Sequence, residues 1–124
     1  MSRILIVDDD PDFLNATRIL LEHEGHQVKS ATGGKQGFAE TLADDPDLVI
    51  LDVMMESVLE GVSVTQKMHA NPATCNIPIM MVSSIAHTDY AALFPTDEYI
   101  YIDAFLSKPV DPTMMVKKVR RVLA

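Results

Sequence analysis

The sequence has little of three things that mark whole classes of protein: cysteine, basic residues and long apolar runs. Cys75 is the single cysteine among 124 residues, so the chain can build neither a disulfide framework nor a thiolate zinc site. We expect a buried or half-buried reduced thiol at that position. Ten basic residues stand against eighteen acidic ones, and a net charge of −8 has the wrong sign for contact with a phosphate backbone. Direct binding to nucleic acid is therefore not expected.

The amino-terminal segment also lacks the features of an export signal or a membrane anchor. Its apolar run covers only residues 4–7, with one arginine before it and a block of aspartates after it. We therefore expect a cytoplasmic protein with no membrane contact. The length and the 48% hydrophobic content suit one globular domain, and no repeat, linker or low-complexity tract divides the chain. The prediction is a single domain over residues 1–124, with no output domain.

Short apolar runs alternate with stretches of helical spacing, which is typical of repeated βα units around a parallel sheet. Strands are predicted at residues 4–7, 27–31, 47–51, 77–82 and 104–107. The strand at 27–31 has few apolar residues and suits a sheet edge, whereas 47–51 is apolar enough to be central. Residues 53–60 are predicted to form a loop, and 85–103 have no clear period beyond a short helix near 90–94.

Aspartate followed by proline marks two predicted helix starts, with Asp10 and Asp111 as N-caps and proline at the first helical position. Gly25 is predicted to end the first of these helices. A further helix is expected over residues 34–43, with Phe38 and Leu42 sharing its apolar face, and another ends near residues 71–72. These helices complete an α/β pattern.

Polar side chains stand at the ends of four predicted strands: Asp8 and Asp9 after the first, Asp52 after the third, Ser83 after the fourth and Lys108 after the fifth. The carboxyl ends of parallel strands meet at one edge of a sheet, so these groups should lie together. Clustered carboxylates need a cation, and an all-oxygen site favours Mg²⁺. A neutralised carboxylate can attack phosphorus while a lysine and a hydroxyl hold phosphoryl oxygens. This set suits phosphoryl transfer to an aspartate.

Four segments in this order resemble the motifs of the response regulator receiver domains of two-component signalling, the CheY-like family. They are ILIVDDDPDF, DLVILDVMM, IPIMMVSS and FLSKPV, and together they span essentially the whole chain. The resemblance implies a flavodoxin-like (βα)5 fold, with a five-stranded parallel sheet in the order 2-1-3-4-5 and helices on both faces. It also implies a phosphoacceptor signalling domain rather than an enzyme, one that catalyses its own phosphorylation and the later hydrolysis.

Carried over to this sequence, the resemblance implies that Asp52 is phosphorylated. Asp9 and Asp52 would ligate Mg²⁺, Asp8 would act mostly through water, and the backbone carbonyl of Met54 would be a further ligand. The catalytic residues would be Asp52, Ser83 and Lys108.

The switch residues implied by the resemblance are Ser83, which would move toward the phosphoryl group, and Phe105, which would change rotamer in response. Lys108 would pair with a phosphoryl oxygen, and its bond to Pro109 is expected to be cis. Two departures from the family pattern are visible. Glu56 and Glu60 replace the usual Pro and Gly beyond the phosphoacceptor, and the stretch between Ser83 and Lys108 is longer than is common.

The expected function is a phosphorylation-controlled switch. The expected partners are a histidine kinase or histidine phosphotransfer protein as donor and a downstream effector protein as reader, with a monomer or a phosphorylation-dependent dimer as the working state. Two alternatives remain open. Asp8–Asp10 contains the Asp-x-Asp of a haloacid-dehalogenase-type phosphatase, although Asp12 stands where that motif wants Thr or Val. A degenerate receiver that binds partners without phosphorylation is the second.

Overall fold

A computed structural model of the chain describes residues 2–52, 58–83 and 104–124. Strands and helices alternate within each of these ranges, as the apolar pattern predicts. The elements are β1 Arg3–Val7, α1 Pro11–His23, β2 Gln27–Ala31, α2 Gly34–Asp44, β3 Leu48–Asp52, α3 Val58–Ala70, β4 Ile79–Ser83, β5 Ala104–Ser107 and α5 Pro112–Leu123. The short helix expected near 90–94 lies outside the described residues.

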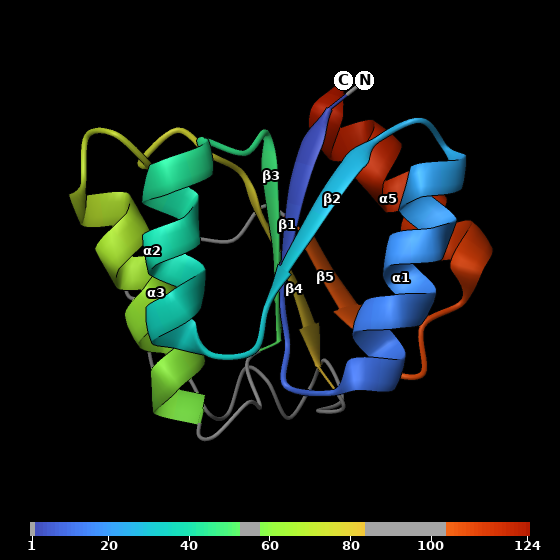
Figure 1. Ribbon diagram of the computed structural model, residues 1–124, viewed down its shortest axis with the longest axis horizontal. Helices are drawn as coiled ribbons and strands as arrows, with labels where there is room; N and C mark the ends of the chain where they lie inside the picture. Colours follow the sequence, from blue (N-terminus) through green and yellow to red (C-terminus); the bar gives the residue numbers. More distant parts are fainter. Residues whose placement is uncertain (1, 53–57, 84–103) are drawn as a thin grey trace.

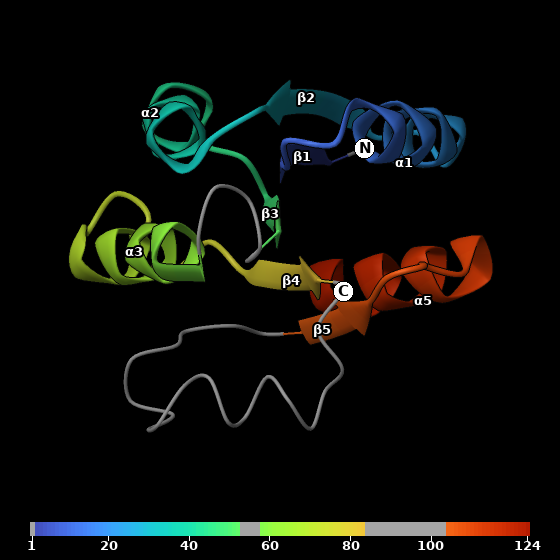
Figure 2. The same ribbon diagram turned by 90° about the horizontal axis from the view of Figure 1, so that it is seen from below.

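The described strands form one parallel sheet in the order β2-β1-β3-β4-β5. Helices α1 and α5 cover one face of the sheet, and α2 and α3 cover the other (Figures 1 and 2). Every residue of β3 is buried, whereas β2 alternates between exposed and partly buried positions before Ala31. The predicted parallel α/β architecture is therefore confirmed, with β3 inside the sheet and β2 at its edge.

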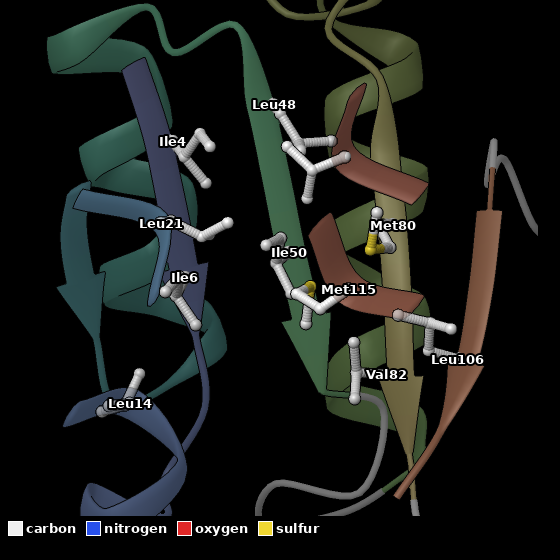
Figure 3. Close-up of a cluster of buried hydrophobic side chains, with 11 residues drawn as sticks. Ile4, Ile6, Leu14, Leu21, Leu48, Ile50, Met80, Val82, Leu106 and Met115 are labelled. Carbon is white, nitrogen blue, oxygen red and sulfur yellow. The ribbon is translucent and has the colours of Figure 1, made fainter. Parts of the chain in front are cut away.

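The two faces of the sheet have separate apolar cores because successive strand residues point to opposite sides. In β1, for example, Ile4 and Ile6 belong to the core under α1 and α5, while Leu5 and Val7 belong to the core under α2 and α3. Figure 3 shows the first of these cores, in which side chains of β1, β3, β4 and β5 meet those of the covering helices. Its buried members are Ile4, Ile6, Leu14, Leu21, Leu48, Ile50, Met80, Val82, Leu106, Met115 and Val119.

Helix α2 approaches the sheet so closely that small residues face it. A Cβ atom built on Gly37 would lie 2.7 Å from Cγ2 of Val7, which is too close for a real side chain. The buried residues of this helix are Gly34, Gly37 and Thr41, and Phe38 is partly buried against the core on this face of the sheet. The prediction that Leu42 shares the buried face is wrong, since Leu42 is 45% exposed. A search for large apolar residues does not find this buried face of α2, because the helix lies so close to the sheet that only small residues fit there.

Two further expectations are corrected. The segment 53–60 is not a loop throughout, because α3 begins at Val58, and so Glu60 lies in a helix. Cys75 is exposed, not buried, and its Sγ lies 3.6 Å from the carbonyl oxygen of Pro72. This cysteine follows α3 in a run of turns before β4 and takes no part in either core. Within the described ranges, no helix is both long enough and apolar enough to cross a membrane.

Candidate functional site

Three aspartates, two directly after β1 and one at the end of β3, gather at the carboxyl edge of the sheet. Asp8 directly follows β1, and Asp52 is the last residue of the neighbouring β3, where its Cα pairs with that of Val82. One carboxylate oxygen from each of Asp8, Asp9 and Asp52 lies within 4.8 Å of the others. Asp8 and Asp52 are buried and Asp9 is exposed, so the cluster has one side open to solvent.

The backbone around β1 fixes the direction of Asp8. Its amide donates to the carbonyl of Ala31 at 3.0 Å, and this bond extends the pairing of β1 and β2 by one residue. Its Oδ1 accepts from the amide of Asp10 at 2.9 Å. Asp10 itself is the N-cap of α1, as predicted, and its carboxylate accepts from the amide of Asp12. The three consecutive aspartates therefore have different roles, since Asp8 and Asp9 belong to the cluster while Asp10 caps the helix.

Among the described residues, Lys108 is the basic residue that forms ion pairs with the cluster. Its Nζ lies 2.8 Å from Oδ2 of Asp8 and 3.3 Å from Oδ2 of Asp52, and its side chain is 19% exposed. The loop after β5 delivers this side chain, and the peptide bond between Lys108 and Pro109 is cis, as expected from the sequence. One lysine thus contacts both buried carboxylates.

Burial and charge act in opposite directions on these groups. Burial raises the pKa of the Asp8 carboxyl above its ordinary value and outweighs the lowering effect of the hydrogen bond from Lys108. For Lys108, burial would lower the pKa, but the hydrogen bond to Asp8 and the charge of Asp52 raise it overall. Among the residues that the structure describes, three carboxylates gather beside one ammonium group, so acidic side chains outnumber basic ones in this part of the site. The donor set fits a hard divalent cation such as Mg²⁺.

An aromatic ring completes the surroundings of the lysine. Nζ of Lys108 lies over the ring of Phe13, 4.4 Å from its centroid. Phe13 sits in the first turn of α1 and is partly buried against the core that this helix covers. The sequence analysis assigns Phe13 no role of its own, although the residue ends the segment ILIVDDDPDF. No signal in a single sequence connects this phenylalanine to a lysine so far along the chain.

The remaining predicted site residues are described only in part. The backbone of Ser83 ends β4, with its Cα paired to that of Ser107, and the Cα of Phe105 in β5 pairs with that of Met81. The side chains of Ser83 and Phe105, and all of Met54, lie outside the described residues. The expected metal role of Met54 and the switch roles of Ser83 and Phe105 stay predictions.

Comparison with known proteins gives consistent matches. The profile of the response regulator receiver domain family matches residues 4–120. The chain is 35% identical to the DNA-binding dual master transcriptional regulator RpaA of Synechocystis, covering 99% of this chain and 49% of RpaA. It is 33% identical to the protein PilH of Pseudomonas aeruginosa, covering 100% of this chain and 99% of PilH. The chain thus spans about half of one curated relative and nearly all of another.

Solved structures agree with the fold. A CheY-like receiver domain protein from Methanospirillum hungatei superposes with a TM-score of 0.85 at 28% identity, over 99% of this chain and 94% of the other. The chemotaxis protein CheY4 of Vibrio cholerae superposes with a TM-score of 0.87 at 24% identity, over 99% of both chains. At that identity, the likeness to CheY4 speaks for the fold alone.

Proposed function

We propose, given that this chain belongs to the response regulator receiver domain family, that Asp52 accepts a phosphoryl group and that its phosphorylation switches the binding of a partner protein. The observation that carries the proposal is the placement of the Asp52 carboxylate. It is 5% exposed, lies at the carboxyl edge of β3, and has Lys108 at 3.3 Å and two further aspartates beside it. A receiver signalling role is the function this arrangement supports best.

Asp8, Asp9 and Asp52 are proposed to hold Mg²⁺, with the backbone carbonyl of Met54 as a further ligand. The fit rests on the donor set, because clustered carboxylates with excess negative charge are the ligands that hard divalent cations prefer. When bound, the ion supplies neutralisation of the charge that otherwise repels an incoming phosphoryl group.

The chain's own residues would carry the transfer as follows. An oxygen of Asp52 forms the new bond to phosphorus while the phosphorus–nitrogen bond of a donor phosphohistidine breaks. The electron pair of that bond stays on the imidazole nitrogen, which leaves with the donor. Lys108 would hold one phosphoryl oxygen as a point charge, and the hydroxyl of Ser83 would donate to another. Phe105 would then change rotamer. In the self-catalysed hydrolysis, water would attack phosphorus, the bond between phosphorus and the Asp52 oxygen would break, and inorganic phosphate would leave the free Asp52 carboxylate.

The proposed donor is a histidine kinase or histidine phosphotransfer protein, and the proposed reader is a downstream effector protein. We propose that this exchange takes place in the cytoplasm. Residues 1–124 would act as one receiver domain, either as a monomer or as a phosphorylation-dependent dimer. The net charge of −8 argues against direct binding of this domain to nucleic acid. The word DNA-binding in the name of RpaA describes a protein about twice as long.

The test is incubation with acetyl phosphate and Mg²⁺, followed by mass spectrometry of the intact protein and mapping of the modified residue. Wild type should gain about 80 Da, the mass of one phosphoryl group replacing a proton. Asp52→Asn should gain nothing, and Asp12→Asn, which changes an exposed aspartate in the first turn of α1, should behave as wild type. Modification at Asp8 would point instead to the phosphatase alternative. If folded wild type is not modified at all, the result would favour the second alternative, a degenerate receiver that binds partners without phosphorylation.

A further inference from the structure

We propose that Phe13 is a positioning residue for phosphoryl transfer, because its ring holds the Lys108 ammonium group at the phosphoacceptor when the carboxylates no longer do. This inference rests on the proposed function, and it concerns a residue that reacts with nothing itself. The observation behind it is that one atom has contacts of two kinds. Nζ of Lys108 has the Asp8 and Asp52 carboxylates at 2.8 and 3.3 Å and the Phe13 ring centroid at 4.4 Å.

The segment that follows β1 supplies both kinds of contact. Asp8 is fixed by its bonds to Ala31 and Asp10, and Phe13 stands in the first turn of the helix that Asp10 caps. The amide of Leu14 donates to the carbonyl of Asp10 at 3.0 Å, and Leu14 is buried in the core. The ring therefore belongs to a helical turn that is held in place by hydrogen bonds and by the burial of Leu14.

The attraction of an ammonium group to a ring differs in kind from its attraction to a carboxylate. The carboxylates attract Lys108 less strongly once a divalent cation shares them and once Asp52 carries the phosphoryl group as an acyl phosphate, and Lys108 must then turn from Asp52 to a phosphoryl oxygen. The ring attracts the cation through its fixed quadrupole, which these events do not change. A lysine side chain has many rotamers, so a contact that persists through the reaction restricts where Nζ can go.

The neighbours of the ring support this reading. Phe13 lines an apolar cleft of about 350 Å³ between α1 and the start of α5, together with Leu20, Val110 and Met115. Apolar surroundings keep the ring in place and strengthen a cation–π contact, since such contacts gain from desolvation. Leucine in place of Phe13 would keep an apolar side chain at this position and remove the quadrupole of the ring.

The experiment compares wild type with Phe13→Leu, which lacks the ring, and Phe13→Tyr, which keeps it. Phosphorylation by acetyl phosphate at saturating Mg²⁺ should slow roughly two- to tenfold in Phe13→Leu, the span that a cation–π contact accounts for. Phe13→Tyr should react at the wild-type rate. The matched control is Phe38→Leu, because Phe38 is also a partly buried aromatic residue but packs in the other core, away from Lys108. It should lose stability and keep its rate.

A spectroscopic signature separates positioning from general stability. In wild type and Phe13→Tyr, the Hε protons of Lys108 should be shifted upfield by the ring current, and in Phe13→Leu this shift should disappear. If Phe13→Leu does not fold, Phe13→Met serves in its place, and the wild-type shift can be read regardless. Equal rates in all variants, or an ordinary Hε shift in wild type, would overturn the inference while the proposed function stands. If wild type takes no phosphoryl group at Asp52, the proposed function fails and the positioning role fails with it.

Discussion

Nζ of Lys108 lies 2.8 Å from Oδ2 of Asp8, although 100 positions of sequence separate the two residues. The contact joins the end of β1 to the loop after β5, and so it depends on the order in which the strands are arranged. A sheet with another order would place these side chains on strands with different neighbours. The ion pair therefore reports on the fold and on the candidate site at once.

Asp8→Asn should stabilise the protein at neutral pH in the absence of Mg²⁺. Burial raises the pKa of Asp8 in the folded state. A carboxyl with a raised native pKa favours folding while it is protonated, and that contribution is lost as the pH rises through the native pKa. Ionised Asp8 thus lowers the free energy of unfolding, and asparagine removes this penalty.

Urea unfolding in a chelating buffer measures the effect of Asp8→Asn. The advantage of the variant should shrink as the pH is lowered into the acidic range, where Asp8 of the wild type binds its proton. Addition of Mg²⁺ should stabilise wild type more than the variant, because a ligand stabilises only the state that binds it. A variant that is less stable than wild type at neutral pH under chelation would contradict the electrostatic account.

Gly37→Ala should destabilise the protein by about 1–3 kcal/mol, the usual range for overpacking a core. Alanine in an ordinary helix interior is instead more favourable than glycine, so the sign of the change is diagnostic. The physical reason is the 2.7 Å separation between the added Cβ and Cγ2 of Val7. Denaturant unfolding checks it, and Val7→Ala should make Gly37→Ala less harmful in the double variant. Simple additivity of the two changes would contradict a clash between them.

Asp111→Ala should lower the free energy of unfolding by about 0.5–2 kcal/mol, as expected for the loss of an N-cap. The carboxylate of Asp111 accepts from the amide of Thr113 at 2.9 Å at the start of α5. Asp111→Asn keeps an acceptor at the same place and is the matched control. Thermal unfolding of the two variants compares them directly, and equal losses in both would point to a role of the charge rather than of the cap.

The sheet and the acidic cluster could be predicted from the sequence because both follow from local patterns. Asp8 directly follows the run that becomes β1 and Asp52 ends β3, and the geometry of a parallel sheet brings such positions together. Aspartate before proline likewise identifies Asp10 and Asp111 as caps, since the signal lies within a few residues.

Features that depend on distances between helices and strands cannot be predicted from local sequence patterns. The burial of Gly37 and exposure of Leu42 follow from how near α2 lies to β1, which no periodicity encodes. The contact of Phe13 with Lys108 is of the same kind. Cys75 was expected to be buried from the habits of its residue type, but the turns after α3 place it at the surface. Tertiary arrangement decides each of these.

The most direct test of the account is a titration of the folded protein with Mg²⁺, followed by NMR of the aspartate side-chain carboxyl carbons. The account predicts that the resonances of Asp8, Asp9 and Asp52 shift together along one saturable single-site curve, while those of the exposed Asp12 stay unchanged. Resonances of the three clustered carboxylates that remain undisturbed by Mg²⁺ would contradict it.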